Sequence, residues 1–195
     1  MYNFEIKFKH MGTTTTSISE VRDRITELKA ELAALQKFDP PQKVQNYTFI
    51  DDRGQEVSLL DVFGDYEDLI VVHNMGAACD YCSLWADGLT GFVKHISERC
   101  AFVVVSPDQY QAQKKIKEKR GWTFDIVSYH GSSFATDMGF WSEEEGFLPG
   151  FSTFSREGDS VVRVACDTFG PGDDYCAIWP MFALLKDGDN GWEPD

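Results

Sequence analysis

The chain has little positive charge and no long apolar stretch. Its 195 residues include 18 lysines and arginines against 32 aspartates and glutamates, which gives a formal net charge of −14. Nucleic acids and anionic membranes bind basic surfaces, so this composition argues against both as partners. The longest apolar runs have about five residues, far fewer than the roughly 20 that span a bilayer. We therefore expect no membrane-spanning segment.

No leader with basic, apolar and small-residue parts opens the chain, so we see no secretion signal. The five cysteines are an odd number and do not match the framework of a secreted disulfide-rich protein. We expect a cytoplasmic protein. In reducing surroundings, a close pair of cysteines is usually catalytic, redox-sensing or metal-binding.

An extension precedes the main domain and covers residues 1–40. Residues 1–12 alternate apolar and polar side chains, which is the period of a strand. They are either an added edge strand or a leader added for expression. Ser17 and Glu20 then form a capping box that predicts a helix start. The apolar residues that follow recur at spacings of three and four and form one seam, namely Ile18, Val21, Ile25, Leu28, Leu32 and Leu35.

The seam has two interpretations. It either packs on the chain's own domain or pairs with a second copy, since the spacing is also that of a short heptad repeat. A homodimer through this helix is therefore one expectation. Pro40-Pro41 is predicted to end the helix.

The main domain is expected over residues 41–186, with a loose polar tail over 187–195. Apolar runs and turn signals alternate there with helical patterns, which predicts a parallel sheet closed by an antiparallel hairpin. The expected strands are 47–50, 69–75, 101–105, 124–128, 149–154 and 160–165. A short return segment is expected at 57–63, and helices are expected at 83–99, 107–121, 132–138 and 173–185.

Cys79-Asp80-Tyr81-Cys82 is the motif that carries chemistry. It follows the apolar run of residues 69–73 and opens a helical stretch, as in thioredoxin-type redox sites. Helix N-termini favour a thiolate, so Cys79 is the predicted nucleophile and Cys82 the resolving thiol. Asp80 opposes ionisation of Cys79, which predicts only a modest lowering of its pKa or a partner from a distant segment. His73 is either that partner or a structural histidine.

Several blocks together resemble the thioredoxin superfamily. The similarity is to a family of uncharacterised bacterial thioredoxin-like proteins near the alkyl hydroperoxide reductase and thiol-specific antioxidant branch. The blocks are 57–63, 69–73, 79–88, 102–106, 119–124 and 149–152. The resemblance implies an α/β, thioredoxin-like fold with a central mixed sheet flanked by helices and an N-terminal helical extension.

The same resemblance implies that Pro149 is a cis-proline that lies against the cysteine motif and supports the substrate backbone. The alternative is an ordinary trans proline at the start of a strand. No cofactor is expected. The peroxidases of this branch carry a Pro-x-x-x-Thr-x-x-Cys pattern, and neither Cys79 nor Cys82 has Pro and Thr at those positions. A peroxidase mechanism of that type is therefore not expected.

The remaining cysteines suggest less. Cys100 precedes a buried-type strand and is expected in the core, whereas Cys166 and Cys176 are candidates to pair or to relay electrons. Zinc is a rival for the motif, but it would need His73, Cys166 or Cys176 to converge on the pair.

Three functions remain open. The first is a thiol–disulfide oxidoreductase acting on an unknown protein or small-molecule thiol or disulfide. The others are a non-catalytic binding or redox-sensing protein and a zinc-binding module.

Overall fold

The centre of the molecule is an eight-stranded sheet in the order β1-β10-β9-β4-β5-β6-β2-β3. The structure is a computed structural model, and it describes residues 16–195. β4, β5 and β6 are parallel to one another, and the other neighbouring strands are antiparallel. The strands of the sheet are β1 (Lys37–Val44), β2 (Thr48–Ile50), β3 (Glu56–Ser58), β4 (Asp68–His73), β5 (Ala101–Ser106), β6 (Asp125–Ser128), β9 (Gly150–Glu157) and β10 (Ser160–Thr168). The predicted α/β fold with a central mixed sheet is confirmed.

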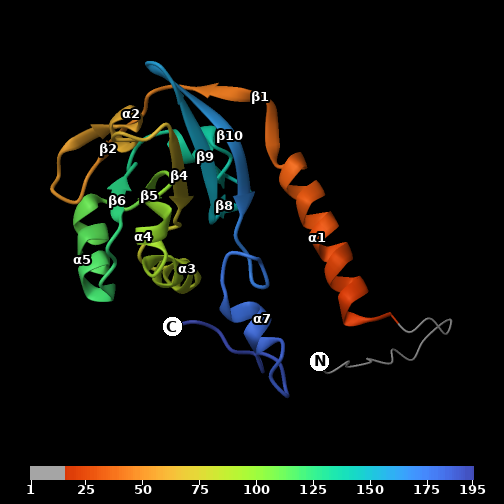
Figure 1. Cartoon of the computed structure of the whole chain (residues 1–195). Coiled ribbons are helices and arrows are strands. Elements are labelled where there is room, and N and C mark those ends of the chain that lie inside the picture. Colours follow the sequence, from red (N-terminus) through yellow and green to blue (C-terminus); the bar gives the residue numbers. More distant parts are fainter. Residues whose placement is uncertain (1–15) are drawn as a thin grey trace.

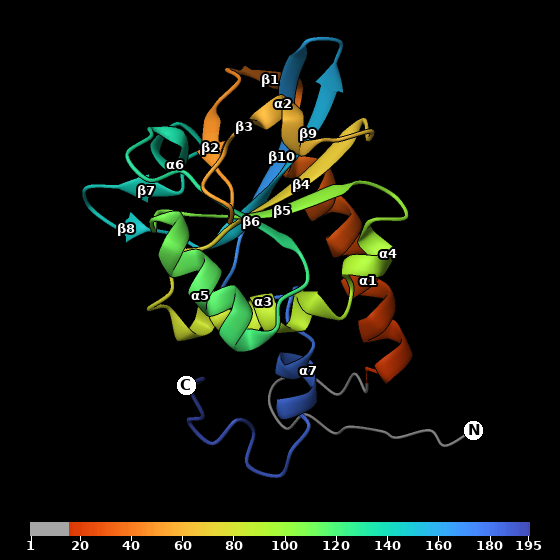
Figure 2. The ribbon, with the colours of Figure 1, turned by 90° about the vertical axis from the view of Figure 1, so that its left-hand side faces the viewer.

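Helices lie on both faces of the sheet (Figure 1, Figure 2). On one face, α2 and α6 cover a core that includes Phe49, Leu69 and Phe134. On the other face, α3, α4 and α5 cover a core that includes Val104 and Phe124. The helices are α1 (Ile18–Leu35), α2 (Leu59–Val62), α3 (Asp80–Thr90), α4 (Val93–Ile96), α5 (Tyr110–Arg120), α6 (Phe134–Asp137) and α7 (Ile178–Phe182).

Some predicted boundaries are wrong. The single helix expected at 83–99 is two helices, because α3 begins earlier, at Asp80, and is capped at Gly91 before α4. The last helix is only α7, since the Asp173 carboxylate accepts hydrogen bonds from Tyr175 and Cys176 and holds that stretch as a turn. The hairpin of β7 (Trp141–Ser142) and β8 (Gly146–Phe147) was not expected. Such short strands give too little periodicity to detect.

The helix start at Ser17 is confirmed. The Ser17 N–H donates to Glu20 Oε2 over 2.7 Å, and the Glu20 N–H donates to Ser17 Oγ over 3.2 Å. α1 ends at Leu35, so Pro40-Pro41 does not end it. The prolines lie in edge strand β1, where its register with β10 shifts, and an edge strand tolerates residues without a donor.

α1 stands apart from the body of the molecule (Figure 1), and none of its residues is buried. The interpretation in which its apolar seam packs on the chain's own domain is therefore wrong. The predicted boundary between residues 40 and 41 falls inside β1, and the division into an extension, a domain and a tail stays a prediction. The strand predicted within residues 1–12 lies outside the described residues.

No helix within residues 16–195 has the length and apolar character needed to cross a membrane.

Candidate functional site

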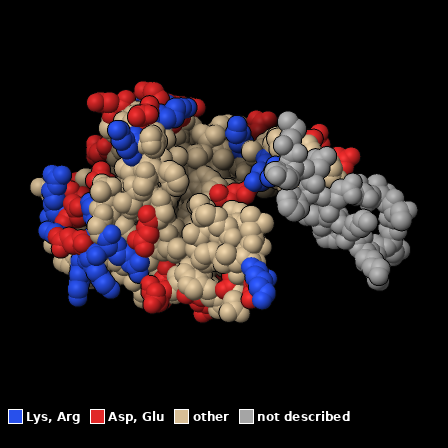
Figure 3. Space-filling view, turned by 60° about the horizontal axis from the view of Figure 1, so that its bottom comes forward, with Lys and Arg blue, Asp and Glu red and all other residues tan. Residues whose placement is uncertain are grey.

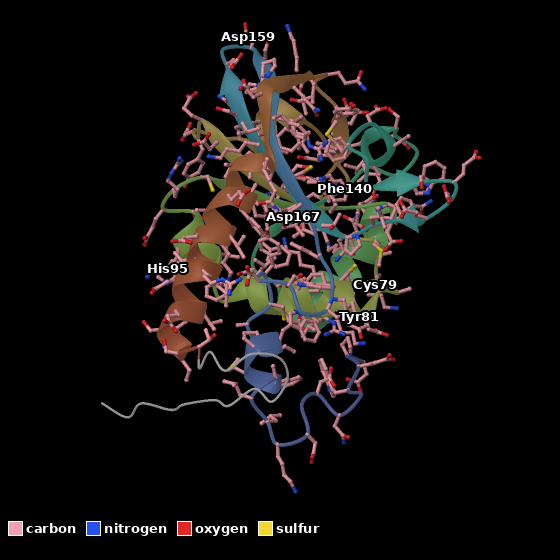
Figure 4. The ribbon with its side chains drawn as sticks, turned by 90° about the vertical axis from the view of Figure 1, so that its right-hand side faces the viewer. Cys79, Tyr81, His95, Phe140, Asp159 and Asp167 are labelled. Atoms are coloured by element: carbon pink, nitrogen blue, oxygen red, sulfur yellow. The ribbon has the colours of Figure 1, made fainter. Side chains whose placement is uncertain are left out.

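Cys79 occupies the N-cap position of α3, directly after the loop that leaves β4. Its sulfur accepts a hydrogen bond from the backbone N–H of Cys82 over 3.0 Å. Figure 4 places Cys79 and Tyr81 together at the start of α3, on the side near α7 and far from Asp159 at the β9–β10 turn. The predicted placement of the pair at a helix N-terminus is confirmed.

The loop between β4 and α3 is fixed by two side-chain acceptors. Asn74 Oδ1 accepts from the Gly76 N–H over 2.7 Å, and Asp108 Oδ2 accepts from the Ala77 N–H over 2.6 Å. Gly76 has a φ of 117°, and a Cβ there would lie 3.2 Å from the Asp108 carboxylate. Only glycine suits this turn, so the approach to Cys79 is set by a residue 29 positions away in the sequence.

The pKa of Cys79 is lowered to about 7. The main cause is hydrogen bonding with the Cys82 thiol, and the N–H groups of Cys82 and Tyr81 add to it. Partial burial and the charge of Asp80 raise the pKa of Cys79, but by less than the hydrogen bonds lower it. The predicted lowering of the Cys79 pKa is therefore too small. That prediction considered the charge of Asp80 but not the hydrogen bond with the Cys82 thiol.

Cys82 has the opposite character. It is buried, and its sulfur accepts from the Met75 N–H over 3.4 Å. Hydrogen bonding with Cys79, followed by burial, raises the pKa of Cys82 far above its ordinary value. The two thiols therefore differ in role at neutral pH, with Cys79 the one that ionises.

Pro149 lines a narrow crevice with Cys82, Trp85 and Phe169, so the structure brings the predicted proline to the cysteine pair. The bond before it is not cis: within residues 16–195 the single cis peptide bond joins Asp39 and Pro40. The Pro149 carbonyl accepts from the Phe169 N–H over 2.8 Å. The expectation of a cis-proline is therefore wrong, and the trans alternative holds.

His73 is a structural histidine. It is buried, hydrogen-bonds through Nε2 to Ser152 Oγ over 2.9 Å, and stacks on Phe140 with 3.8 Å between ring centroids. Burial, and then the charge of Arg163, lower its pKa well below the ordinary value, so it is neutral. Arg163 Nε also donates to Ser152 Oγ, over 3.1 Å. The contact of Arg163 with Ser152 was not predicted, since nothing near Arg163 in the sequence points to His73.

The sequence reasoning also missed the aromatic cluster around Tyr81. The Tyr81 ring lies 6.0 Å from Trp85 and 6.4 Å from Trp179, and Trp85 Nε1 donates to Asp173 Oδ2 over 3.0 Å. The segment after β10 therefore packs against the start of α3. The concentration of aromatic residues in 169–192 was the available signal. Figure 3 shows this end of the molecule, where a broad uncharged area lies between the charged groups at its margins.

The other cysteines do not join the pair. All five cysteines are free thiols, and Cys100 and Cys176 are buried while Cys166 is half-buried. Within residues 16–195, no three His, Cys, Asp or Glu side chains come together as a metal site would need. The convergence that the zinc alternative requires is not found in this part of the chain.

Together, the sheet and the dithiol at the start of α3 define a thioredoxin-fold protein with a Cys-x-x-Cys site. Residues 18–192 match the family described as bacterial proteins of unknown function (DUF899), and the chain belongs to this family. No curated protein matches the chain in sequence.

Solved structures share the fold. Peroxidoxin BcpB from Mycobacterium tuberculosis is 20% identical with a TM-score of 0.55, over 66% of this chain and 84% of that one. The bacterioferritin comigratory protein of Xanthomonas campestris is 13% identical with a TM-score of 0.56, over 68% and 87%. A hypothetical protein from Sinorhizobium meliloti is 17% identical with a TM-score of 0.52, over 80% and 86%. The fold thus lies near the peroxiredoxins, as the resemblance in sequence implied.

Proposed function

We propose that this protein is a thiol–disulfide oxidoreductase in which Cys79 attacks and Cys82 resolves. The observation that supports this most is the pKa of Cys79, about 7, beside a buried Cys82 whose pKa is raised. At pH 7 about half of Cys79 is then thiolate, the form that attacks disulfides. Cys82 keeps its proton until the second step.

The chemistry runs in two exchanges. The Cys79 thiolate attacks one sulfur of a substrate disulfide, forms a mixed disulfide and expels the other substrate sulfur as a thiolate. Cys82 then loses its proton, attacks the Cys79 sulfur and forms the Cys79–Cys82 disulfide, which releases the second substrate thiolate. The substrate gains two electrons, and an external thiol restores the reduced pair.

The substrate is a disulfide or thiol on a protein or small molecule, and Pro149 supports it beside Cys82. The peroxiredoxin neighbours raise hydroperoxides as an alternative oxidant. However, Val72 and Gly76 stand seven and three residues before Cys79, where the peroxidases of this branch carry Pro and Thr. This difference favours a disulfide over a peroxide.

One observation favours a second candidate, a redox-sensing or binding protein without turnover. The backbone beside Pro149 is already paired within the chain, because the Leu148 N–H donates to Phe140 and the Pro149 carbonyl accepts from Phe169. Fewer groups are then free to hold an extended substrate strand.

Mass spectrometry of the reduced protein treated with oxidised glutathione tests the proposal. We expect a Cys79–Cys82 disulfide in the wild type and a stable glutathione adduct on Cys79 in Cys82→Ser. Cys79→Ser should form neither product, and Cys100→Ser, which changes a buried thiol outside the pair, should behave as the wild type. The proposal fails if no Cys79–Cys82 disulfide forms at any redox potential.

Turnover separates the two candidates. With excess dithiothreitol and a fluorogenic glutathione disulfide, an oxidoreductase reduces many equivalents of substrate, whereas a sensor is oxidised once. A matched assay with hydrogen peroxide gives the third outcome: faster oxidation of Cys79 by peroxide than by disulfide would indicate a peroxidase.

A further inference from the structure

The apolar seam of α1 faces solvent. Its six residues follow the heptad spacing, with Ile18, Ile25 and Leu32 at one position and Val21, Leu28 and Leu35 at the other. In five of them, all except Ile18, 41–76% of the residue surface is exposed to solvent. An exposed stripe of this kind on an otherwise polar helix indicates an interaction surface.

Little within residues 16–195 supports α1. Besides its connection to β1, it is held by an ion pair in which Lys29 Nζ lies 2.7 Å from Asp174 Oδ1, and both side chains are more than half exposed. An isolated helix of 18 residues is only marginally stable in water, because helices in proteins gain most stability by packing an apolar face. No other part of the described chain supplies that packing for α1.

We propose that α1 pairs antiparallel with α1 of a second copy of this chain. In that arrangement the two apolar stripes meet over a length of roughly 27 Å, since a helix rises 1.5 Å per residue. Ile18 of one copy lies near Leu35 of the other, and Ile25 lies near Leu28 at the centre. The apolar stripe of α1 thus contacts the same stripe of the second copy, as a two-fold symmetric interface requires.

The charges beside the seam fix the orientation. Arg24 and Glu31 occupy the same flanking heptad position, and an antiparallel pair brings Arg24 of each copy to Glu31 of the other. On the opposite flank Arg22 meets Lys29, whose charge Asp174 balances within its own chain. A parallel pair would set Arg24 against Lys29 and Glu31 against Gln36, so that no opposite charges meet.

The test is light scattering with size-exclusion chromatography on the full chain across a range of concentrations. We expect a concentration-dependent dimer in the wild type. Leu28→Glu, at the centre of the seam, should weaken it by more than about 100-fold. Ala30→Glu lies on the outer side of the same helix and is the matched control, which should leave the dimer unchanged.

Charge reversal tests the orientation even if Leu28→Glu does not fold. Arg24→Glu and Glu31→Arg should each weaken the homodimer by up to about tenfold. A one-to-one mixture of the two variants should restore dimers, because each variant then meets an opposite charge. A tighter dimer in Arg24→Glu alone would indicate the parallel arrangement and overturn the proposal.

Two further results would also overturn it. One is a wild type that stays monomeric at every concentration. Another protein, or another part of this chain, would then cover the seam in place of a second copy. The other is a dimer that survives both Leu28→Glu and the single charge reversals. Hydrogen exchange of the α1 amides supplies a second readout, since their protection should increase with protein concentration.

Discussion

The backbone N–H of Cys82 lies 3.0 Å from the sulfur of Cys79 and donates a hydrogen bond to it. The residue that would resolve the mixed disulfide therefore also stabilises the thiolate that starts the reaction. This dual role depends on the first turn of α3, because that turn brings a residue three positions later in the chain back to its N-cap.

Replacing Cys82 by alanine should slow alkylation of Cys79. Hydrogen bonding with the Cys82 thiol is the main cause of the low pKa of Cys79. Without it, the pKa should rise toward the ordinary value of about 8.5, and the thiolate fraction at pH 7 should fall about tenfold. The rate of iodoacetamide labelling of Cys79 against pH measures this. An unchanged pH profile would show that the backbone alone sets the pKa.

Asp80→Asn should act in the other direction. The Asp80 carboxylate raises the pKa of Cys79, so its neutralisation should lower that pKa further and increase labelling at pH 6 by a few-fold. Asp65→Asn changes an exposed acid before the first residue of β4, whereas Cys79 follows the other end of that strand, and it should have no effect. Equal effects from both substitutions would instead point to the net charge of the protein.

His73 should make the protein less stable in mild acid. The folded state holds His73 neutral, with a pKa well below 6.5, while the unfolded chain binds a proton near pH 6.5. The unfolded chain therefore binds more protons than the folded protein once the pH falls below about 6.5. Above that pH, His73 adds no pH dependence to the free energy of unfolding. Below that it should decrease by up to about 1.4 kcal/mol per pH unit.

Urea denaturation between pH 7.5 and pH 5 measures this dependence. His73→Gln should remove most of the slope between pH 6.5 and pH 5, whereas His130→Gln, at an exposed position, should keep it. A wild type equally stable at both ends of the window would contradict the assignment of a neutral buried His73.

Gly150 and Gly88 should respond oppositely to alanine. A Cβ on Gly150 would lie 2.3 Å from the Asp167 carbonyl oxygen and 2.5 Å from Phe140 Cε1, which forces backbone to move. We expect Gly150→Ala to lower the free energy of unfolding by about 3 kcal/mol. Gly88 lies in α3 with nothing within 4 Å of a built Cβ, so Gly88→Ala should raise it by about 0.5–1 kcal/mol. Thermal and urea unfolding check both, and equal effects would show that the contacts at Gly150 relax freely.

Local features were predictable from the sequence because their causes lie within a few residues. The capping box at Ser17, the heptad seam, the parallel strands and the Cys79–Cys82 pair at a helix start each depend on spacing along the chain. The α/β class followed from the alternation of apolar runs with helical patterns, and the relation to the peroxiredoxin branch came from the resemblance of sequence blocks to a known family.

Only the tertiary structure decided the character of the site and the exposure of the seam. Asp108 fixes the loop before Cys79, and Phe169 ties the trans Pro149 to the chain after β10. These contacts join residues 20 or more positions apart, so spacing along the chain does not reveal them. The hydrogen bonds that lower the pKa of Cys79 come instead from Tyr81 and Cys82, next to it in the sequence. The sequence thus determined which residues form the dithiol and the seam. The fold decided that Cys82 is buried beside Pro149, that Asp108 holds the loop before Cys79 and that residues 16–195 leave the seam of α1 uncovered.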